Sequence, residues 1–194
     1  MAKAPDNAPI ITVRSRTELH GWLAAHHTDG QTVWLAYFRK HHTDHLSYEP
    51  LVEELLGWGW IDSLPRALDA DRTMLLIAPR KATSAWSAIN KAHVARARAS
   101  GAMTPAGEAK IAAAQASGMW DFLDDVERLE VPRDLAEALA VKAARATWDG
   151  FPRSIRRGAL EWLKMAKGPE TRAARIADIA DSAAEGMRPK PFRR

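Results

Sequence analysis

The sequence predicts an α+β protein, with a small antiparallel sheet and packed helices followed by a helical C-terminal module. Runs of β-branched and aromatic residues, such as 10–13 and 32–38, are confined to the first 80 residues and are typical of strands. From residue 83 onward, alanine-rich segments begin at Ser, Thr or Pro and several of them end at Gly, which is typical of helices. Hydrophobic residues make up 46% of the 194 residues, enough to form a core.

Strands and helices are expected to alternate in the first half of the chain. The segment 32–38 is apolar on both faces, which favours a central position in the sheet. Strands near 60–68 and 72–77 are expected to pair across a turn at the Asp-Ala-Asp segment 69–71. The remaining elements expected here are a short strand at 10–13 and helices at 17–27 and 48–56.

The second half of the chain is expected to contain only helices. A helix capped by Thr83 or Ser84 is expected to run to about residue 99, and another to run from Pro105 to Gly118. Pro132, Ser154 and Pro169 are expected to begin the last three helices, the third of which ends near Gly186. We expect two domains, 1–125 and 126–194, with a basic tail on the second and the acidic stretch 121–130 as a linker.

Composition excludes several classes of protein. The chain has no cysteine, so it has no disulfide, thiolate zinc site, iron–sulfur cluster or cysteine nucleophile. It contains no apolar run of the roughly 18–20 residues that a membrane helix needs, and no secretory signal is recognised at its start. We therefore expect no membrane insertion and a cytoplasmic location.

Positive charge is concentrated in the C-terminal third. Lys and Arg number 14 against 16 Asp and Glu up to Glu130, but 14 against 8 from Val131 to Arg194. This excess suits an acidic partner, an anionic ligand or nucleic acid, or is simply a solvated helical surface. Nucleic acid is the less favoured partner, because acidic residues interrupt the cations and no exposed aromatic residues accompany them. The pattern indicates no particular protein partner.

Charge also suggests how the C-terminal module is attached. Arg172 and Arg175 fall near the start of the last predicted helix, where cations are unfavourable unless an acidic group faces them. We expect them to contact the acidic residues Asp124, Asp125 and Glu127.

Aromatic, charged and polar residues between positions 58 and 90 form the strongest candidate site. If the stretch after residue 57 is extended, its two tryptophans and an aspartate share one face, and two cations precede a helix start that would favour an anion. The set suits a small anionic or aromatic ligand. In the alternative interpretation the tryptophans are core, Asp62 pairs with Arg80, and the polar residues cap helices. The candidate ligand-binding residues are Trp58, Trp60, Asp62, Arg80, Lys81, Ser84, Trp86, Ser87 and Asn90.

Motifs for catalysis or metal binding are weak or absent. His41, His42 and His45 lie with Asp44 in a polar loop, but such clusters arise by chance, so no metal site is expected. The sequence contains no Gly-x-Ser-x-Gly, Walker or His-Glu-x-x-His motif. No catalytic residue and no cofactor are therefore predicted, although an enzyme of unrecognised type stays an alternative.

Two groups of motifs occur in a specific order along the chain. The first group lies at 57–63, 79–81, 84–87, 90 and 101–107, and the second at 131–132, 134–135, 138–139, 166–167 and 170–176. Together they resemble the YdeI/OmpD-associated family, also called OmdA or bacteriocin-protection proteins. The resemblance implies a link to stress or bacteriocin protection and supplies no catalytic residues. We therefore predict a small-ligand or anion-binding protein, with a nucleic-acid-associated protein as the alternative.

Overall fold

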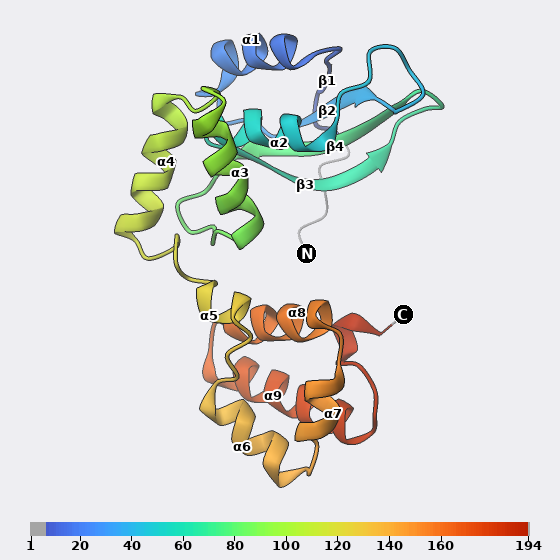
Figure 1. Cartoon of the computed structure of the whole chain (residues 1–194), viewed down its shortest axis with the longest axis vertical. Coiled ribbons are helices and arrows are strands. Elements are labelled where there is room, and N and C mark those ends of the chain that lie inside the picture. Colours follow the sequence, from blue (N-terminus) through green and yellow to red (C-terminus); the bar gives the residue numbers. More distant parts are fainter. Residues whose placement is uncertain (1–6, 194) are drawn as a thin grey trace. The chain divides into compact units, whose positions relative to one another are not determined.

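The structure is a computed structural model that describes residues 7–193. The chain divides into two compact units, Met1–Phe122 and Leu123–Arg194, so the division falls close to the predicted boundary after residue 125. All described strands belong to the first unit, and the second unit is helical (Figure 1). The predicted α+β class is confirmed.

The N-terminal unit contains a four-stranded sheet in the order β1-β2-β4-β3. Strands β2, β4 and β3 pair antiparallel, but β1 pairs parallel with β2, so the sheet is mixed and the fully antiparallel prediction was wrong. The reason is α1, which carries the chain back so that β2 runs in the direction of β1. The elements are β1 (Ile10–Thr12), α1 (Arg16–His26), β2 (Val33–Phe38), α2 (Tyr48–Gly57), β3 (Trp60–Ala67), β4 (Arg72–Pro79), α3 (Ala88–Ala99) and α4 (Pro105–Ala116).

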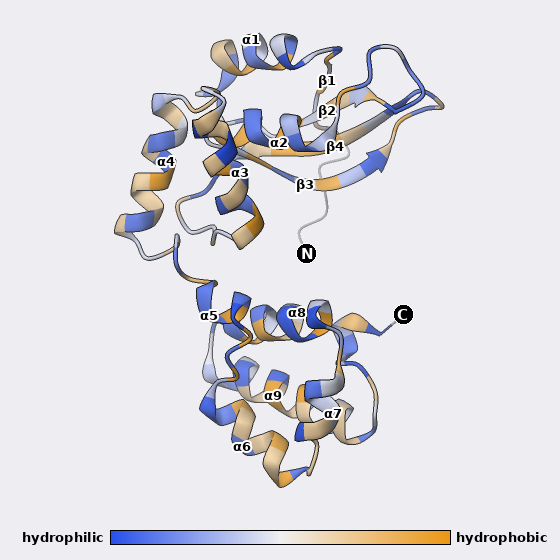
Figure 2. Cartoon of the chain, viewed as in Figure 1, coloured by the Kyte–Doolittle hydropathy of each residue, from blue (hydrophilic) through white to orange (hydrophobic). Residues whose placement is uncertain are grey.

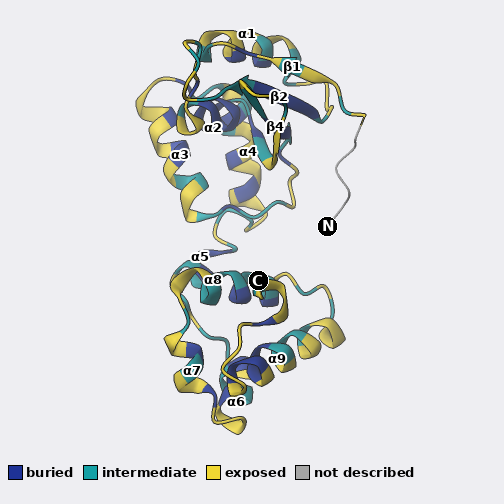
Figure 3. Ribbon diagram, turned by 90° about the vertical axis from the view of Figure 1, so that its right-hand side faces the viewer, coloured by how far each residue is buried: buried dark blue, intermediate teal, exposed yellow. Residues whose placement is uncertain are grey.

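The central position predicted for the second strand is confirmed. Val33 and Leu35 of β2 belong to the main core with residues of α1 and α2, whereas Trp34 and Ala36 belong to a smaller apolar cluster. Figure 3 accordingly shows β2 as buried. Both faces of β2 are therefore covered, as its two-sided apolar sequence requires.

Two helix starts differ from their predicted positions. Ser15 rather than Thr17 caps α1, because its side chain accepts the Glu18 N–H. Ser87 rather than Thr83 or Ser84 caps α3. The preceding residues are held by other bonds, since the Trp86 N–H donates to the Met119 carbonyl and the Arg80 side chain binds the Ala85 carbonyl.

Helices α2 and α4 meet at two glycines. The Gly57 carbonyl accepts bonds from the Thr104 N–H at 3.0 Å and the Thr104 hydroxyl at 2.7 Å. A Cβ built on Gly107 would lie 2.3 Å from that carbonyl oxygen, and one on Gly57 would lie 2.3 Å from the Ala102 oxygen. Only residues without a side chain permit this approach.

The C-terminal unit packs its helices around leucine and tryptophan side chains. Helices α5 and α7 were not predicted; both are short, and Trp148 of α7 is buried. Helix α6 stops at Val141, and Ala143 adopts φ +50°, so Ala143 does not extend the apolar face of that helix. The elements are α5 (Asp124–Glu127), α6 (Arg133–Val141), α7 (Arg145–Gly150), α8 (Arg153–Lys164), α9 (Pro169–Ala184) and η1 (Lys190–Phe192).

The boundary between the two units falls inside the predicted linker 121–130, and its residues 123–130 belong to the C-terminal unit. Leu123 and Val126 are buried there. Asp121 contacts Lys91 of α3 at 3.2 Å. Farther along the stretch, two cations of α8 bind it: Lys164 contacts Asp125 at 2.6 Å and Arg157 contacts Glu127 at 2.7 Å. The expected contacts with Arg172 and Arg175 were therefore wrong, because α8 is the helix that packs against α5.

Arg172 instead joins α9 to α6. Its guanidinium donates to both oxygens of Asp134, at 2.6 and 2.9 Å. Arg175 donates to the Trp162 carbonyl, and its guanidinium lies 5.0 Å from the Trp162 ring centroid.

The pair of Arg172 and Asp134 predicts a pH-dependent contribution to stability. The hydrogen bond from Arg172 lowers the pKa of Asp134, so the contribution is present above the unfolded pKa of about 3.9 and is lost as the pH falls through the folded pKa. Because both side chains are one-third exposed or more, we expect Arg172→Gln to lower the free energy of unfolding by at most about 1 kcal/mol at neutral pH. Urea unfolding at neutral and at strongly acidic pH measures this, and an equal loss at both would contradict it.

Candidate functional site

Three of the nine predicted site residues lie in the core of the N-terminal unit. Trp60 and Trp86 are each 1% exposed and Arg80 is 4% exposed. The Trp60 indole N–H donates to the His27 carbonyl at 3.3 Å. The Arg80 guanidinium carbon lies 3.7 Å from the Trp86 ring centroid, and Nη2 donates to the Ala85 carbonyl at 2.8 Å. These contacts agree with the alternative interpretation, in which the tryptophans are core.

Residues 58 and 59 form a turn before β3, so Trp58 and Trp60 do not lie on one extended segment and the condition for a shared face is not met. Trp58 caps the end of α2, and Gly59 follows with φ +75°, the conformation that commonly ends a helix. The Trp58 ring packs against His20 and His27, whereas Trp60 packs against Trp22.

The remaining predicted residues have separate local roles. Asp62 accepts a hydrogen bond from the Tyr48 hydroxyl at 2.9 Å and does not pair with Arg80. Ser87 caps α3 by accepting the Asn90 N–H. Ser84 lies in the turn before that cap, and Lys81 is exposed.

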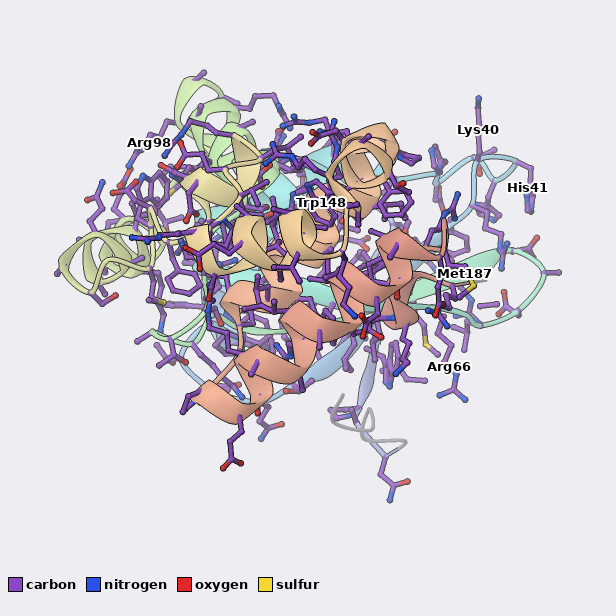
Figure 4. The ribbon with its side chains drawn as sticks, turned by 90° about the horizontal axis from the view of Figure 1, so that it is seen from below. Lys40, His41, Arg66, Arg98, Trp148 and Met187 are labelled. Atoms are coloured by element: carbon purple, nitrogen blue, oxygen red, sulfur yellow. The ribbon has the colours of Figure 1, made fainter. Side chains whose placement is uncertain are left out.

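The histidines of the loop after β2 do not converge. His41 contacts Asp71, His42 stacks on Phe38, and His45 contacts the Phe38 carbonyl. Lys40 and His41 project outward from this loop (Figure 4). Within residues 7–193, no group of three or more His, Asp or Glu side chains could hold a metal ion.

A buried carboxylate that the sequence interpretation missed lies between α1 and α2. Glu54 is 2% exposed. Its carboxylate accepts hydrogen bonds from Arg16 Nε at 2.8 Å, His20 Nδ1 at 2.7 Å and Trp58 Nε1 at 3.3 Å. The cluster borders an open hollow of about 470 Å³. The sequence signal was the pair Glu53 and Glu54 inside an otherwise apolar stretch. Its observed contacts neutralise the carboxylate and attach α1 to α2.

Most described cations of the C-terminal unit are neutralised by carboxylates. Besides the pairs already described, Arg133 binds Glu137, Arg145 binds Asp149, and Lys190 binds Asp178. Six described cations of this unit have no carboxylate within 4.0 Å. They are Arg153, Arg156, Lys167, Arg175, Arg188 and Arg193.

Two of these cations face a hollow of about 360 Å³, which we call the basic hollow. It is lined by Pro152, Ser154, Ile155, Arg188, Pro191, Phe192 and Arg193. Arg193 is fixed in place, because its Nε donates to the Arg188 carbonyl at 2.8 Å and its Nη2 to the Ser182 hydroxyl at 2.9 Å. An arginine oriented in this way still presents other N–H groups to a ligand.

Helix α8 adds to the positive potential of the basic hollow. Its first turn contains no acidic residue, and Pro152 provides no side-chain cap. Arg153 and Arg156, which have no described carboxylate within 4.0 Å, lie in its first turn, and hydrophilic residues recur along the helix (Figure 2). Cations at the positive end of a helix dipole are unfavourable, so a bound anion would be stabilised there.

Two family models match separate parts of the chain. Residues 11–110 match a family described as a domain of unknown function, DUF8412. Residues 128–186 match the family described as Bacteriocin-protection, YdeI or OmpD-Associated, OmdA. The chain belongs to the DUF8412 family and carries a C-terminal OmdA domain. No curated protein and no solved structure matched.

The candidate residues and the basic hollow lie in different parts of the chain. All nine predicted site residues and the Glu54 cluster lie in the DUF8412 match, as does the whole first group of motifs that resembled the OmdA family. The OmdA match contains Pro152, Ser154 and Ile155, but it ends before Arg188. The basic hollow is thus built jointly by the OmdA domain and the segment that follows it. Among the described residues, no helix is both long and apolar enough to cross a membrane.

Proposed function

We propose that the C-terminal unit binds a small anion in the basic hollow, and that this binding serves the bacteriocin protection from which the OmdA family takes its name. The observation that carries the proposal is the position of Arg188 and Arg193. Both residues line the hollow, and neither has a carboxylate partner in the described part of the chain. Guanidinium groups match the oxygens of carboxylate and phosphate.

A second hollow in the C-terminal unit differs from the basic hollow in that its cations are already paired, which supports the basic hollow as the anion site. It measures about 320 Å³ and is also lined by two cations, Lys164 and Arg172. Asp125 and Asp134 already neutralise these cations. An anion entering there would have to displace a carboxylate, whereas an anion entering the basic hollow gains new partners without losing existing ones.

The proposal is tested by calorimetric titration of the full chain with inorganic phosphate at low ionic strength. We expect measurable binding that Arg188→Gln and Arg193→Gln each weaken by about tenfold, since a hydrogen bond to a charged group contributes about 1.5–3 kcal/mol. Arg133→Gln is the matched control, because it removes the same charge from an exposed arginine that already pairs with Glu137. The Arg133→Gln chain should bind phosphate with the same affinity as the wild-type chain.

Two outcomes would contradict the proposal. One is the absence of phosphate binding by the wild-type chain, and the other is an equal loss of affinity in all three variants, which would indicate a general effect of net charge. Circular dichroism of each variant verifies that its fold is intact. Binding of duplex DNA with a steep salt dependence, lost in Arg188→Gln and Arg193→Gln, would instead indicate a nucleic-acid-associated protein.

A further inference from the structure

We infer that the anion bound in the basic hollow is a phosphate monoester whose substituent is a flat, apolar or aromatic ring. This inference rests on the proposed function and adds the chemical class of the ligand. Three properties of the hollow carry it: its size, its apolar wall and its uncompensated charge.

The hollow is larger than a bare anion requires. Its volume of about 360 Å³ lies at the lower end of the range of roughly 300–1,000 Å³ found for small-molecule pockets. A single inorganic ion beside the arginines would leave the rest of this space to water. A ligand that fills it needs an additional group beyond the charged one.

Part of the lining of the hollow is apolar. Pro152, Ile155 and Pro191 line it together with Phe192. The Phe192 ring lies directly against the backbone of α8, because a Cβ built on Gly158 would be 2.7 Å from ring carbon Cε1. Phe192 stays partly exposed, so a ring of the ligand can pack against it, an arrangement that aromatic pairs favour.

The charge of the hollow favours phosphate over carboxylate. Arg188 and Arg193 supply two positive charges, and the first turn of α8 contains no acidic residue to offset them. A phosphate monoester carries about −1.5 to −2 charges at pH 7 and three acceptor oxygens. A carboxylate offers one charge and two oxygens, so it would leave one guanidinium uncompensated. Ser154, which also lines the hollow, carries a hydroxyl that can donate to a third oxygen.

The test compares three probes on the full chain by calorimetry: phenyl phosphate, inorganic phosphate and benzoate. We expect phenyl phosphate to bind about tenfold more tightly than inorganic phosphate, and benzoate to bind more weakly than phenyl phosphate. Phe192→Ala should reduce the affinity for phenyl phosphate to that for inorganic phosphate while leaving phosphate binding unchanged. Gly158→Ala, which displaces the Phe192 ring, should act in the same direction.

Each result separates this inference from the proposed function. If inorganic phosphate binds but phenyl phosphate binds no more tightly, the ring is excluded and anion binding stands. If benzoate equals phenyl phosphate, the phosphate is excluded. If none of the three probes binds, the proposed function itself fails. If Phe192→Ala unfolds the domain, Phe192→Leu replaces it as the variant. In addition, the amide chemical shifts of Gly158 and Phe192 are then measured in the wild-type chain with and without phenyl phosphate. If phenyl phosphate leaves these shifts unperturbed, the inference is overturned.

Discussion

Replacing Gly107 by alanine is expected to destabilise the DUF8412 domain by about 3 kcal/mol, at the upper end of the typical cost of overpacking. The added Cβ would lie 2.3 Å from the Gly57 oxygen, 2.8 Å from the Gly57 carbonyl carbon and 2.7 Å from the Met103 sulfur. The sulfur can move, but the carbonyl cannot, because both the Thr104 N–H and the Thr104 hydroxyl are bonded to it. Helices α2 and α4 must therefore separate.

A second glycine provides the matched control for this substitution. Gly21 lies within α1, is exposed and has no neighbouring atom within 4 Å of an added Cβ. Gly21→Ala should therefore raise stability by about 1 kcal/mol, the difference in helix propensity. Urea unfolding followed by circular dichroism measures both variants. If Gly107→Ala were as stable as Gly21→Ala, the close approach of the two helices would be refuted.

Trp86→Ala is expected to cost about 3–5 kcal/mol, the range for truncating a buried aromatic side chain. The indole is 1% exposed, packs against Trp120, and supports the buried guanidinium of Arg80. Burial already lowers the pKa of Arg80 to about 10. Truncation would therefore leave both a cavity and a buried charge without its aromatic partner.

The loss at Trp86 also distinguishes the two interpretations of the tryptophans. A residue lining an open ligand pocket should tolerate truncation with little change in stability, whereas a core residue should not. Ile89→Ala is the control from the adjoining helix, because Ile89 is 69% exposed, and it should change stability by less than about 0.5 kcal/mol. Unfolding by urea measures both variants, and a stable Trp86→Ala protein would restore the pocket hypothesis.

Local sequence patterns predicted most of the secondary structure. Two-sided apolar character identified β2 as a central strand, and Thr104 followed by Pro105 identified the start of α4. These signals were sufficient because caps and strand burial depend on neighbouring residues. The cap of α3 was assigned to Thr83 or Ser84 instead of Ser87, because three hydroxyl residues compete within five positions and only contacts with Met119 and Arg80 decide among them.

The sequence predicted the candidate site less well than the secondary structure. Trp60, Trp86 and Arg80 were selected because aromatic and cationic residues line ligand pockets, but the same residue types stack in cores, and sequence does not distinguish the two. The basic excess of the C-terminal third was visible in the composition. Which cations remain without a carboxylate was not visible, because Lys164, Arg157 and Arg172 find their acidic partners on other helices.

The sequence alone determined the α+β class, the helical C-terminal half, the OmdA resemblance and the sign of the charge in the last third. The resemblance depends on short sequence motifs and the other three on composition or short-range periodicity, which the chain carries in any conformation. Tertiary structure alone decided that β1 pairs parallel with β2, that Trp60 and Trp86 are core, and that Arg188 and Arg193 share a hollow with Phe192 and the start of α8. Burial and charge compensation depend on residues distant in sequence, so they exist only once the chain has folded.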